Sequence, residues 1–167
     1  MLYLFDLDDT LITGYMSNPD KDYNIWHVLT RRVEALRELI ARGNCVCIIT
    51  NQGGVAFGHV TEDQADAKIE RALALLGLRS PRWDGSASQR CVYACYSDIR
   101  GKAPWNDPID AARRKPSGVM IREAMADHPD AAARGVLYVG DRPEDEAAAR
   151  DAGVPFQWTH IFFKDNA

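Results

Sequence analysis

Short apolar runs alternate along this chain with longer segments of helical periodicity. The first run, residues 1–5, is apolar without alternation, which is typical of a buried parallel strand. We expect strands at 1–5, 45–49, 90–96, 136–139 and 154–158, and helices at 28–42, 62–76, 117–126 and 143–152. The alternation predicts an α/β fold, a three-layer Rossmann-like parallel sheet with helices on both faces and right-handed crossovers.

Several helix ends carry their own sequence signals. Thr61 and Gln64 match a capping box before the segment 62–76, and Gly77 follows its last apolar residue. Pro143 suits the first turn of the segment 143–152, because proline lacks the amide that a first turn leaves unpaired. These signals place the helix boundaries more firmly than periodicity alone.

Composition limits the classes of protein that this chain can represent. The chain has 167 residues, and no linker or repeat interrupts it, so we expect a single domain over 1–167. Its net charge of −4, with no extended basic tract, argues against avid nonspecific binding of nucleic acid. The apolar start is too short for a signal peptide and no run is long enough to span a bilayer, so we expect a cytoplasmic protein without membrane contact. Its oligomeric state stays open.

Three carboxylates follow the first strand directly, at Asp6, Asp8 and Asp9. Ionised carboxylates this close repel one another and resist burial, and a hard divalent cation is the commonest way to tolerate them. In an extended chain, Asp6 and Asp8 lean to the same side and Asp9 points away. One carboxylate can attack phosphorus to form an aspartyl phosphate, while the other transfers protons. The cluster therefore indicates Mg²⁺ and phosphate chemistry.

Further polar groups follow the other strands. Thr50 and Asn51 are neutral donors after the second strand, and Lys115 is a cation that can stabilise the oxygens of a transferring phosphoryl group. Asp141 follows the fourth strand, where it can complete a Mg²⁺ site with Asp6. Each group alone has an ordinary structural explanation. In parallel sheets, however, ligands bind at the carboxyl ends of the strands, where these groups gather.

Three charged residues beside these groups are possible supporting or substrate-contacting residues. Asp145 lies in a first helical turn, where compensation of the helix dipole is the simpler explanation. Arg114 precedes Lys115, and Arg142 follows Asp141. A surface salt bridge is an equally good explanation of Arg142.

The complete set of motifs resembles the haloacid dehalogenase (HAD) superfamily of phosphohydrolases. The matching residues are Asp6-Leu7-Asp8-Asp9-Thr10, Thr50-Asn51-Gln52, Lys115-Pro116 and Gly140-Asp141 with Asp145. By this resemblance, Asp6 is the nucleophile and Asp8 the general acid and base, and Thr50 and Lys115 hold the phosphoryl group. The resemblance also implies that Asp6, the Asp8 backbone carbonyl and Asp141 bind Mg²⁺.

The segment Arg114-Lys115-Pro116, with Gly118 and Met120 after it, resembles a narrower, subclass III-like group. This group contains histidinol phosphatases, heptose bisphosphate phosphatases and polynucleotide 3′-phosphatases. The first two often carry a zinc loop before the Arg-Lys-Pro motif. Here Cys95 stands in that region without a second cysteine near Arg113, so the zinc loop looks lost. Zinc bound by the four cysteines, Cys45, Cys47, Cys91 and Cys95, is the alternative to their packing as small buried residues.

The sequence leaves little room for a cap over the site. Only 40 residues separate Thr10 from Thr50, and a helix occupies much of that interval. We therefore expect a minimal cap or none, a mobile loop at 11–23, and an open site that admits bulky phosphates. The candidate residues for substrate specificity are Trp26, His27, Tyr96, Arg100, Lys102 and Trp105, for which local packing is the alternative.

The leading hypothesis is a Mg²⁺-dependent phosphomonoesterase that works through an aspartyl phosphate. Its substrate is a small phosphometabolite or a nucleic-acid 3′-phosphate, and the sequence leaves the natural substrate and pathway open. One alternative is a receiver-like signalling domain, which accepts phosphate on an aspartate in the middle of the chain and not near position 6. Another is an inactive phosphate-binding module, against which the presence of every chemical group argues.

Overall fold

The computed structural model describes residues 1–78 and 90–165. Over these residues it contains one parallel sheet of five strands in the order β3-β2-β1-β4-β5. Each strand lies within or close to a predicted segment: β1 (Leu2–Phe5), β2 (Cys45–Asn51), β3 (Val92–Cys95), β4 (Val136–Gly140) and β5 (Phe156–Trp158). Because β1 lies between β2 and β4, the ends of these three strands are neighbours.

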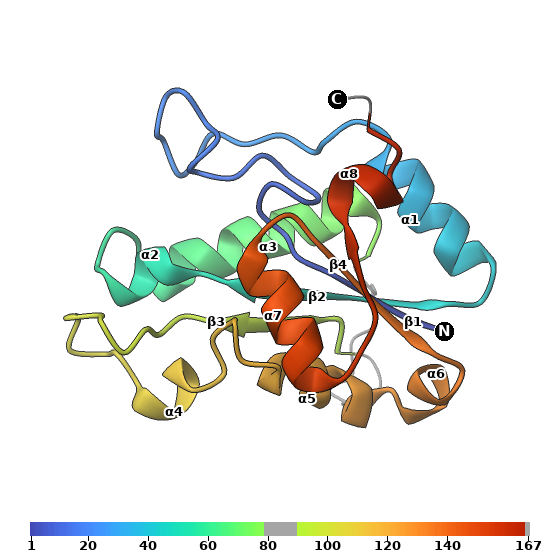
Figure 1. Cartoon of the computed structure of the whole chain (residues 1–167). Helices are drawn as coiled ribbons and strands as arrows, with labels where there is room; N and C mark the ends of the chain where they lie inside the picture. The colour runs from blue at the N-terminus through green and yellow to red at the C-terminus, as the bar shows by residue number, and fades with distance from the viewer. Residues whose placement is uncertain (79–89, 166–167) are drawn as a thin grey trace.

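Helices cover both faces of the sheet (Figure 1). The described helices are α1 (Arg32–Ala41), α2 (Gly53–Ala56), α3 (Glu62–Leu76), α4 (Pro108–Ala111), α5 (Val119–Asp127), α6 (Pro129–Ala133), α7 (Pro143–Ala152) and α8 (Thr159–Phe162). Helices α5, α6 and α7 share a hydrophobic core with one face, and α1, α3 and α8 pack on the other. The predicted three-layer α/β architecture is confirmed.

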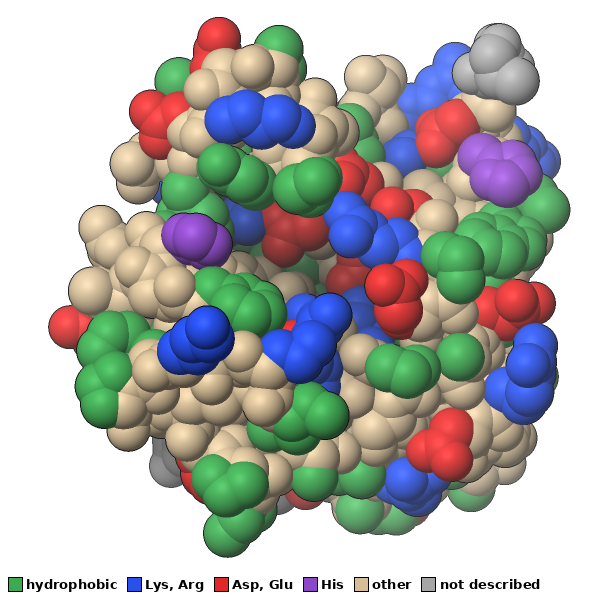
Figure 2. Space-filling model, turned by 60° about the vertical axis from the view of Figure 1, so that its left-hand side comes forward, with side chains coloured by type: hydrophobic (Ala, Val, Ile, Leu, Met, Phe, Trp, Pro, Cys, Tyr) green, Lys and Arg blue, Asp and Glu red, His purple; other side chains and the backbone are tan. Residues whose placement is uncertain are grey.

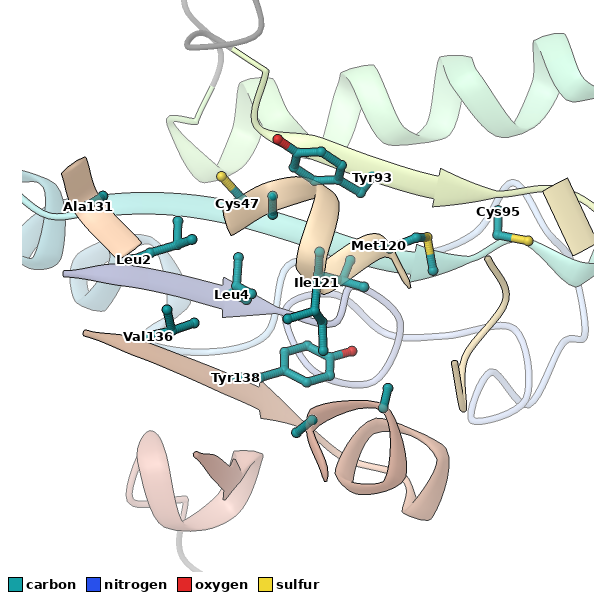
Figure 3. Packing of buried hydrophobic residues seen from close by; sticks show 14 residues of the cluster. Leu2, Leu4, Cys47, Tyr93, Cys95, Met120, Ile121, Ala131, Val136 and Tyr138 are labelled. Atoms are coloured by element: carbon teal, nitrogen blue, oxygen red, sulfur yellow. The ribbon is translucent and has the colours of Figure 1, made fainter. Parts of the chain in front are cut away.

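The core between the sheet and α5 to α7 is built from strand side chains that meet small helix residues. Leu4 and Tyr138 from the sheet are fully buried in one cluster with Ile121 of α5 (Figure 3). Ala148 of α7 belongs to the same cluster. Burial of this apolar surface supplies much of the free energy that favours folding. The close packing also fixes α5 and α7 relative to the strand ends that carry the polar residues.

The opposite core contains aromatic side chains from the end of the chain. Phe5 of β1 makes an edge-on contact with Phe162, whose ring centroid lies 5.4 Å away, and Phe163 is buried beside it. Phe156 and Trp158 are half-buried on the edge strand β5 and contact each other edge to face. The contacts of Phe162 and Phe163 with Phe5 join the C-terminal segment to β1.

Helix α3 has the bounds and caps that its sequence predicts. The side chain of Thr61 accepts a hydrogen bond from the amide of Gln64, whose own side chain bonds the amide of Thr61. Gly77 ends the helix in the left-handed conformation. Helix α7 likewise begins at Pro143 and ends at Ala152 as predicted.

The predicted helix at 28–42 is wrong in its first turn, since α1 begins only at Arg32. Val28 instead pairs with Ile12, and the amide of Leu29 donates to the Leu11 carbonyl at 3.0 Å. Arg31 then takes a left-handed φ of 64° before the helix starts. The apolar spacing did not distinguish this extended approach from a helical turn.

Other boundaries differ by a few residues. Helix α5 runs two residues later at its start and one later at its end than predicted. Short helices α2, α4, α6 and α8 were not predicted, and α4 lies in the segment 97–114 that was expected to be irregular. Residues 6–31, all of which are described, form no helix, in agreement with a minimal cap at this position. No helix of the described residues is long and apolar enough to cross a membrane.

Candidate active site

A polar pocket opens at the carboxyl ends of the central strands. Its volume is about 900 Å³, and Asp6, Asp8, Asn51 and Lys115 are among the residues that line it. Figure 2 shows acidic side chains inside a hollow on this face, with Lys and Arg side chains around it. The loop at 11–23, expected beside the site, supplies part of the wall through Tyr15 and its neighbours.

Lys115 lies at the centre of the site, although it comes from the turn before α5. Its Nζ donates to Asp6 Oδ1 at 2.5 Å and to Asp145 Oδ1 at 2.7 Å. Burial alone would lower the pKa of Lys115, but the carboxylates of Asp6 and Asp145 outweigh that effect and raise it above the ordinary value. The site therefore holds a fixed ammonium group directly beside Asp6.

Asp145, at the start of α7, connects Lys115 to the turn after β4 through hydrogen bonds. Its Oδ1 accepts from Lys115 and from the hydroxyl of Tyr138 at 2.8 Å, and its Oδ2 accepts from the amides of Asp141 and Arg142 at 3.2 and 3.1 Å. Both oxygens are thus occupied, which suits the predicted supporting role. A Cβ on Gly140 would lie 2.5 Å from this carboxylate, so the close approach depends on glycine.

Three carboxylates beside Lys115 form a candidate cation site. Single oxygens of Asp6, Asp141 and Asp145 lie within 4.8 Å of one another. Burial raises the pKa of Asp6 well above its usual range, although the charge of Lys115 opposes this effect. The pKa of Asp141 is also raised, mainly by burial and next by the negative charge of Asp145. An all-oxygen donor set of this kind fits Mg²⁺, because hard cations prefer carboxylate and carbonyl oxygens.

The side chain of Asp8 faces a different set of partners. Its Oδ1 accepts from Lys68 Nζ at 2.5 Å, and its Oδ2 accepts from Gln52 Nε2 at 3.0 Å. Gln52 also donates to the Thr50 hydroxyl at 2.8 Å and accepts from the Tyr23 hydroxyl at 3.0 Å. Both side-chain oxygens of Asp8 are therefore bonded to residues outside the group formed by Asp6, Asp141 and Asp145.

The sequence analysis did not identify Lys68 or Tyr23 as members of the site, and it included Gln52 only in the Thr50-Asn51-Gln52 motif, without a role. Lys68 did carry a usable signal, because it falls among the apolar positions of α3, three residues after buried Ala65 and one before buried Ile69. A lysine on the buried face of an amphipathic helix usually has a charged partner. For Gln52 and Tyr23, only the tertiary structure shows the contact.

Asn51 is tied to the backbone of Lys115. Its Nδ2 donates to the Lys115 carbonyl at 3.1 Å, and its Oδ1 accepts from the Lys115 amide at 3.0 Å. In the structure this side chain positions Lys115. Its Nδ2 carries a second hydrogen, and Asn51 lines the pocket, so its contact with phosphate stays a prediction. Thr50 lies at the end of β2, buried beneath Gln52.

Arg114 and Arg142, the two arginines considered as supporting or substrate-contacting residues, line the pocket. Arg114 is held by Asp98, whose Oδ2 lies 2.9 Å from its Nε, and Arg142 lies 3.4 Å from Asp9. Asp9 itself turns away from Asp6 and Asp8 and accepts from the Gly14 amide at 2.7 Å.

The candidate specificity residues mostly serve local packing. Trp26, His27, Tyr96, Arg100, Lys102 and Trp105 do not line the pocket. The indole of Trp105 donates to the Val55 carbonyl at 3.1 Å, and Arg100 pairs with Asp98. The structure supports the packing alternative for Trp26, Tyr96 and Trp105.

The four cysteines do not converge on one site. Cys45 and Cys47 begin β2, with their sulfurs 3.9 Å apart and His128 Nδ1 3.5 Å from Cys45, whereas Cys95 lies opposite Asn51 at the far end of the sheet. Cys47 and Cys95 are fully buried. This distribution agrees with cysteines that pack as small core residues.

Comparison with known proteins identifies the family. The profile of the polynucleotide kinase 3 phosphatase family matches residues 1–165. The chain belongs to this family. Its members and relatives place it among the HAD superfamily phosphatases, so the chain is a phosphatase.

Curated relatives at about 30% identity carry one description. A D-glycero-β-D-manno-heptose-1,7-bisphosphate 7-phosphatase from Pasteurella multocida is 29% identical over 89% of this chain and 75% of its own length. The corresponding protein of Rhodopseudomonas palustris is 33% identical over 80% of this chain and 74% of its own length.

Solved structures share the fold. A HAD-like phosphatase structure from Mesorhizobium loti has a TM-score of 0.66 and 27% identity, covering 91% of this chain and 68% of its own. A D,D-heptose 1,7-bisphosphate phosphatase from B. bronchiseptica, complexed with magnesium and phosphate, also has a TM-score of 0.66, at 24% identity over 93% of this chain and 78% of its own.

Proposed function

We propose that this phosphatase is a Mg²⁺-dependent phosphomonoesterase that forms an aspartyl phosphate on Asp6. The observation that carries the proposal is the buried ion pair of Asp6 and Lys115, with Lys115 Nζ 2.5 Å from Asp6 Oδ1. The pair lies at the edge of the sheet where the strands end, next to Asp141. The pair puts a potential nucleophile next to a fixed cation that can hold phosphate oxygens. The receiver-like and inactive alternatives are not favoured.

The residues divide the reaction into two displacements. In the first, an oxygen of Asp6 forms a bond to phosphorus, the bond from phosphorus to the ester oxygen breaks, and Asp8 gives that oxygen a proton. In the second, Asp8 takes a proton from water, whose oxygen attacks phosphorus and frees Asp6. Lys115 stays charged and stabilises the equatorial oxygens throughout.

The metal site fits the same scheme. Asp6, Asp141 and the Asp8 backbone carbonyl would hold Mg²⁺, while Asp145 fixes Lys115 and the turn after β4. When bound, Mg²⁺ neutralises charge between the nucleophile and the phosphate.

We propose a small phosphorylated metabolite with a second anionic group, such as a sugar bisphosphate, as the substrate class. The pocket of about 900 Å³ is of ordinary small-molecule size, and Lys21, His59 and Arg114 line it in addition to Lys115. The relatives of 29–33% identity are described as heptose bisphosphate phosphatases, which supports this class. The family description favours a second candidate, a nucleic-acid 3′-phosphate.

A substrate panel tests both levels of the proposal. Sugar bisphosphates, amino-alcohol phosphates and a 3′-phosphorylated oligonucleotide are assayed for released phosphate with Mg²⁺ and with EDTA. We expect hydrolysis only with Mg²⁺ and the highest kcat/KM on a sugar bisphosphate. Preference for the oligonucleotide would replace the substrate class, and absence of Mg²⁺-dependent hydrolysis on every ester would overturn the function.

A further inference from the structure

A buried lysine on helix α3 holds the side chain of Asp8. Lys68 is only 7% exposed, and its Nζ lies 2.5 Å from Asp8 Oδ1. We propose that Lys68, together with Gln52 and Tyr23, positions Asp8 for proton exchange with the leaving group. This inference rests on the proposed function, since it concerns how the same site moves a proton.

The contacts hold the carboxylate from two sides. Lys68 binds Oδ1, and Gln52 Nε2 donates to Oδ2 at 3.0 Å. Gln52 is itself oriented, because its Oε1 accepts from the Tyr23 hydroxyl and its Nε2 also donates to Thr50. With both oxygens engaged, the plane of the Asp8 carboxylate is fixed relative to the pocket.

The lysine has no evident role in packing. Its neighbours on the buried face of α3 are Ala65, Ile69 and Ala72, so an apolar side chain would suit this position. Burial of an ammonium group costs free energy unless a partner offsets it. The partners in the structure are the Asp8 carboxylate and the ring of Tyr23, whose centroid lies 4.8 Å from Nζ. The position is therefore explained by the charge of Asp8 and not by the hydrophobic core.

The geometry assigns different tasks to the two oxygens of Asp8. Because Oδ1 faces the ammonium group, Oδ2 is the oxygen that carries the proton to the leaving group and later accepts one from water. Lys68 keeps its own proton and acts only through Asp8, so it is a positioning residue. A general acid or base must lie within hydrogen-bonding distance of the atom with which it exchanges a proton. Losing the contact with Lys68 should therefore slow protonation of the leaving group in the first displacement and deprotonation of water in the second.

The test is the substitution Lys68→Met, assayed on two esters. Alkyl phosphates have a poor leaving group that needs a proton, whereas p-nitrophenyl phosphate has a good one. On the alkyl ester we expect kcat/KM, which reports the first displacement alone, to fall about 10- to 100-fold, because general acid catalysis contributes about 10²- to 10⁴-fold. On p-nitrophenyl phosphate we expect kcat/KM to change by less than about threefold on the same basis, whereas kcat falls on both esters wherever the shared second displacement limits turnover. Arg71→Met, an exposed cation on the same helix, is the matched control.

Two further variants separate positioning from structure. In an Asp8→Asn background, Lys68→Met should cause no additional loss, because the residue it acts through is already disabled. Tyr23→Phe removes only the hydroxyl that orients Gln52 and should reproduce the ester dependence in weaker form, even if Lys68→Met folds poorly.

The opposite outcomes are equally clear. Equal losses of kcat/KM on both esters, an unchanged kcat/KM on the alkyl ester, or additive losses with Asp8→Asn would overturn the positioning role. A wild-type protein that hydrolyses neither ester would instead contradict the proposed function itself.

Discussion

At the scale of single residues, the site is organised around charges that the fold buries. Asp6 is 6% exposed and Lys115 likewise, and neither would be stable there alone. Burial raises the pKa of Asp6 although Lys115 lies beside it, so a bound cation would favour the ionised form. A nucleophile held in this way needs its partners to stay charged.

The substitution Asp6→Asn tests the nucleophile directly. It keeps the shape of the side chain but removes the attacking oxygen, so kcat should fall by about 10³-fold or more, as for other covalent nucleophiles. Since the neutral amide avoids the cost of a buried charge and leaves Lys115 paired with Asp145, the melting temperature should not fall. Phosphate release and thermal unfolding are the measurements. A variant with a tenth or more of the wild-type kcat would refute the assignment.

Site residues that directly follow a strand could be predicted from the sequence, whereas one on a helix and one on a loop could not. Asp6 and Asp141 each follow an apolar strand. Because the carboxyl ends of parallel strands meet at one edge of the sheet, the sequence predicts that these two residues lie close together. Lys68 lies on a helix and Tyr23 on a loop, and neither has a fixed position relative to the strand ends until the chain packs. For Asn51 the residue was identified but its partner was not, because its bonds go to the backbone of Lys115.

At the scale of elements, local signals succeeded where caps define the ends. The capping box of α3 and the proline of α7 gave exact bounds. The start of α1 was missed because residues 27–29 pair with residues 11–13, which no local pattern records. The short helix α6 begins at Pro129 immediately after α5, and five residues are too few for a periodicity to be recognised.

The turn from β4 to α7 depends on the absence of a side chain at Gly140. A Cβ there would lie 2.5 Å from both Cβ and Oδ2 of Asp145. Gly140→Ala should therefore displace Asp145, lower the free energy of unfolding by about 1–3 kcal/mol through overpacking, and reduce kcat because Lys115 loses its support. Denaturant unfolding and phosphate release measure the two effects.

A matched glycine shows whether crowding is the cause. At Gly54 a Cβ would meet only a methyl group of Val60, at 3.2 Å, which can move. Gly54→Ala should thus cost less stability than Gly140→Ala. Equal stability of the Gly140→Ala variant and the wild type would show that the turn tolerates a side chain.

At the scale of the whole molecule, the sheet order explains why distant segments form one site. Placing β1 between β2 and β4 gathers Asp6, Thr50 and Asp141, and packing of α5 and α7 on one face brings Lys115 and Asp145 beneath them. The other face contributes α3, which carries Lys68 toward Asp8. The two helical layers therefore bring Lys115, Lys68 and Asp145 to the site, while the ends of the strands supply Asp6, Asp8 and Asp141.

This architecture predicts that Mg²⁺ stabilises the folded chain independently of catalysis. The oxygens of Asp6, Asp141 and Asp145 converge only when the strands are assembled, so the ion should bind the folded state preferentially. At 100 times its dissociation constant, such a ligand adds about 2.7 kcal/mol, or about 5–10 °C in Tm for a chain of this size. Thermal unfolding with Mg²⁺ and with EDTA measures the shift. Asp141→Asn should abolish most of this shift in Tm. Glu146→Gln should retain the shift, because Glu146 lies in α7, close to Asp141 in the chain but outside the carboxylate cluster. An equal shift in Asp141→Asn would place the ion elsewhere and remove Asp141 from the metal site.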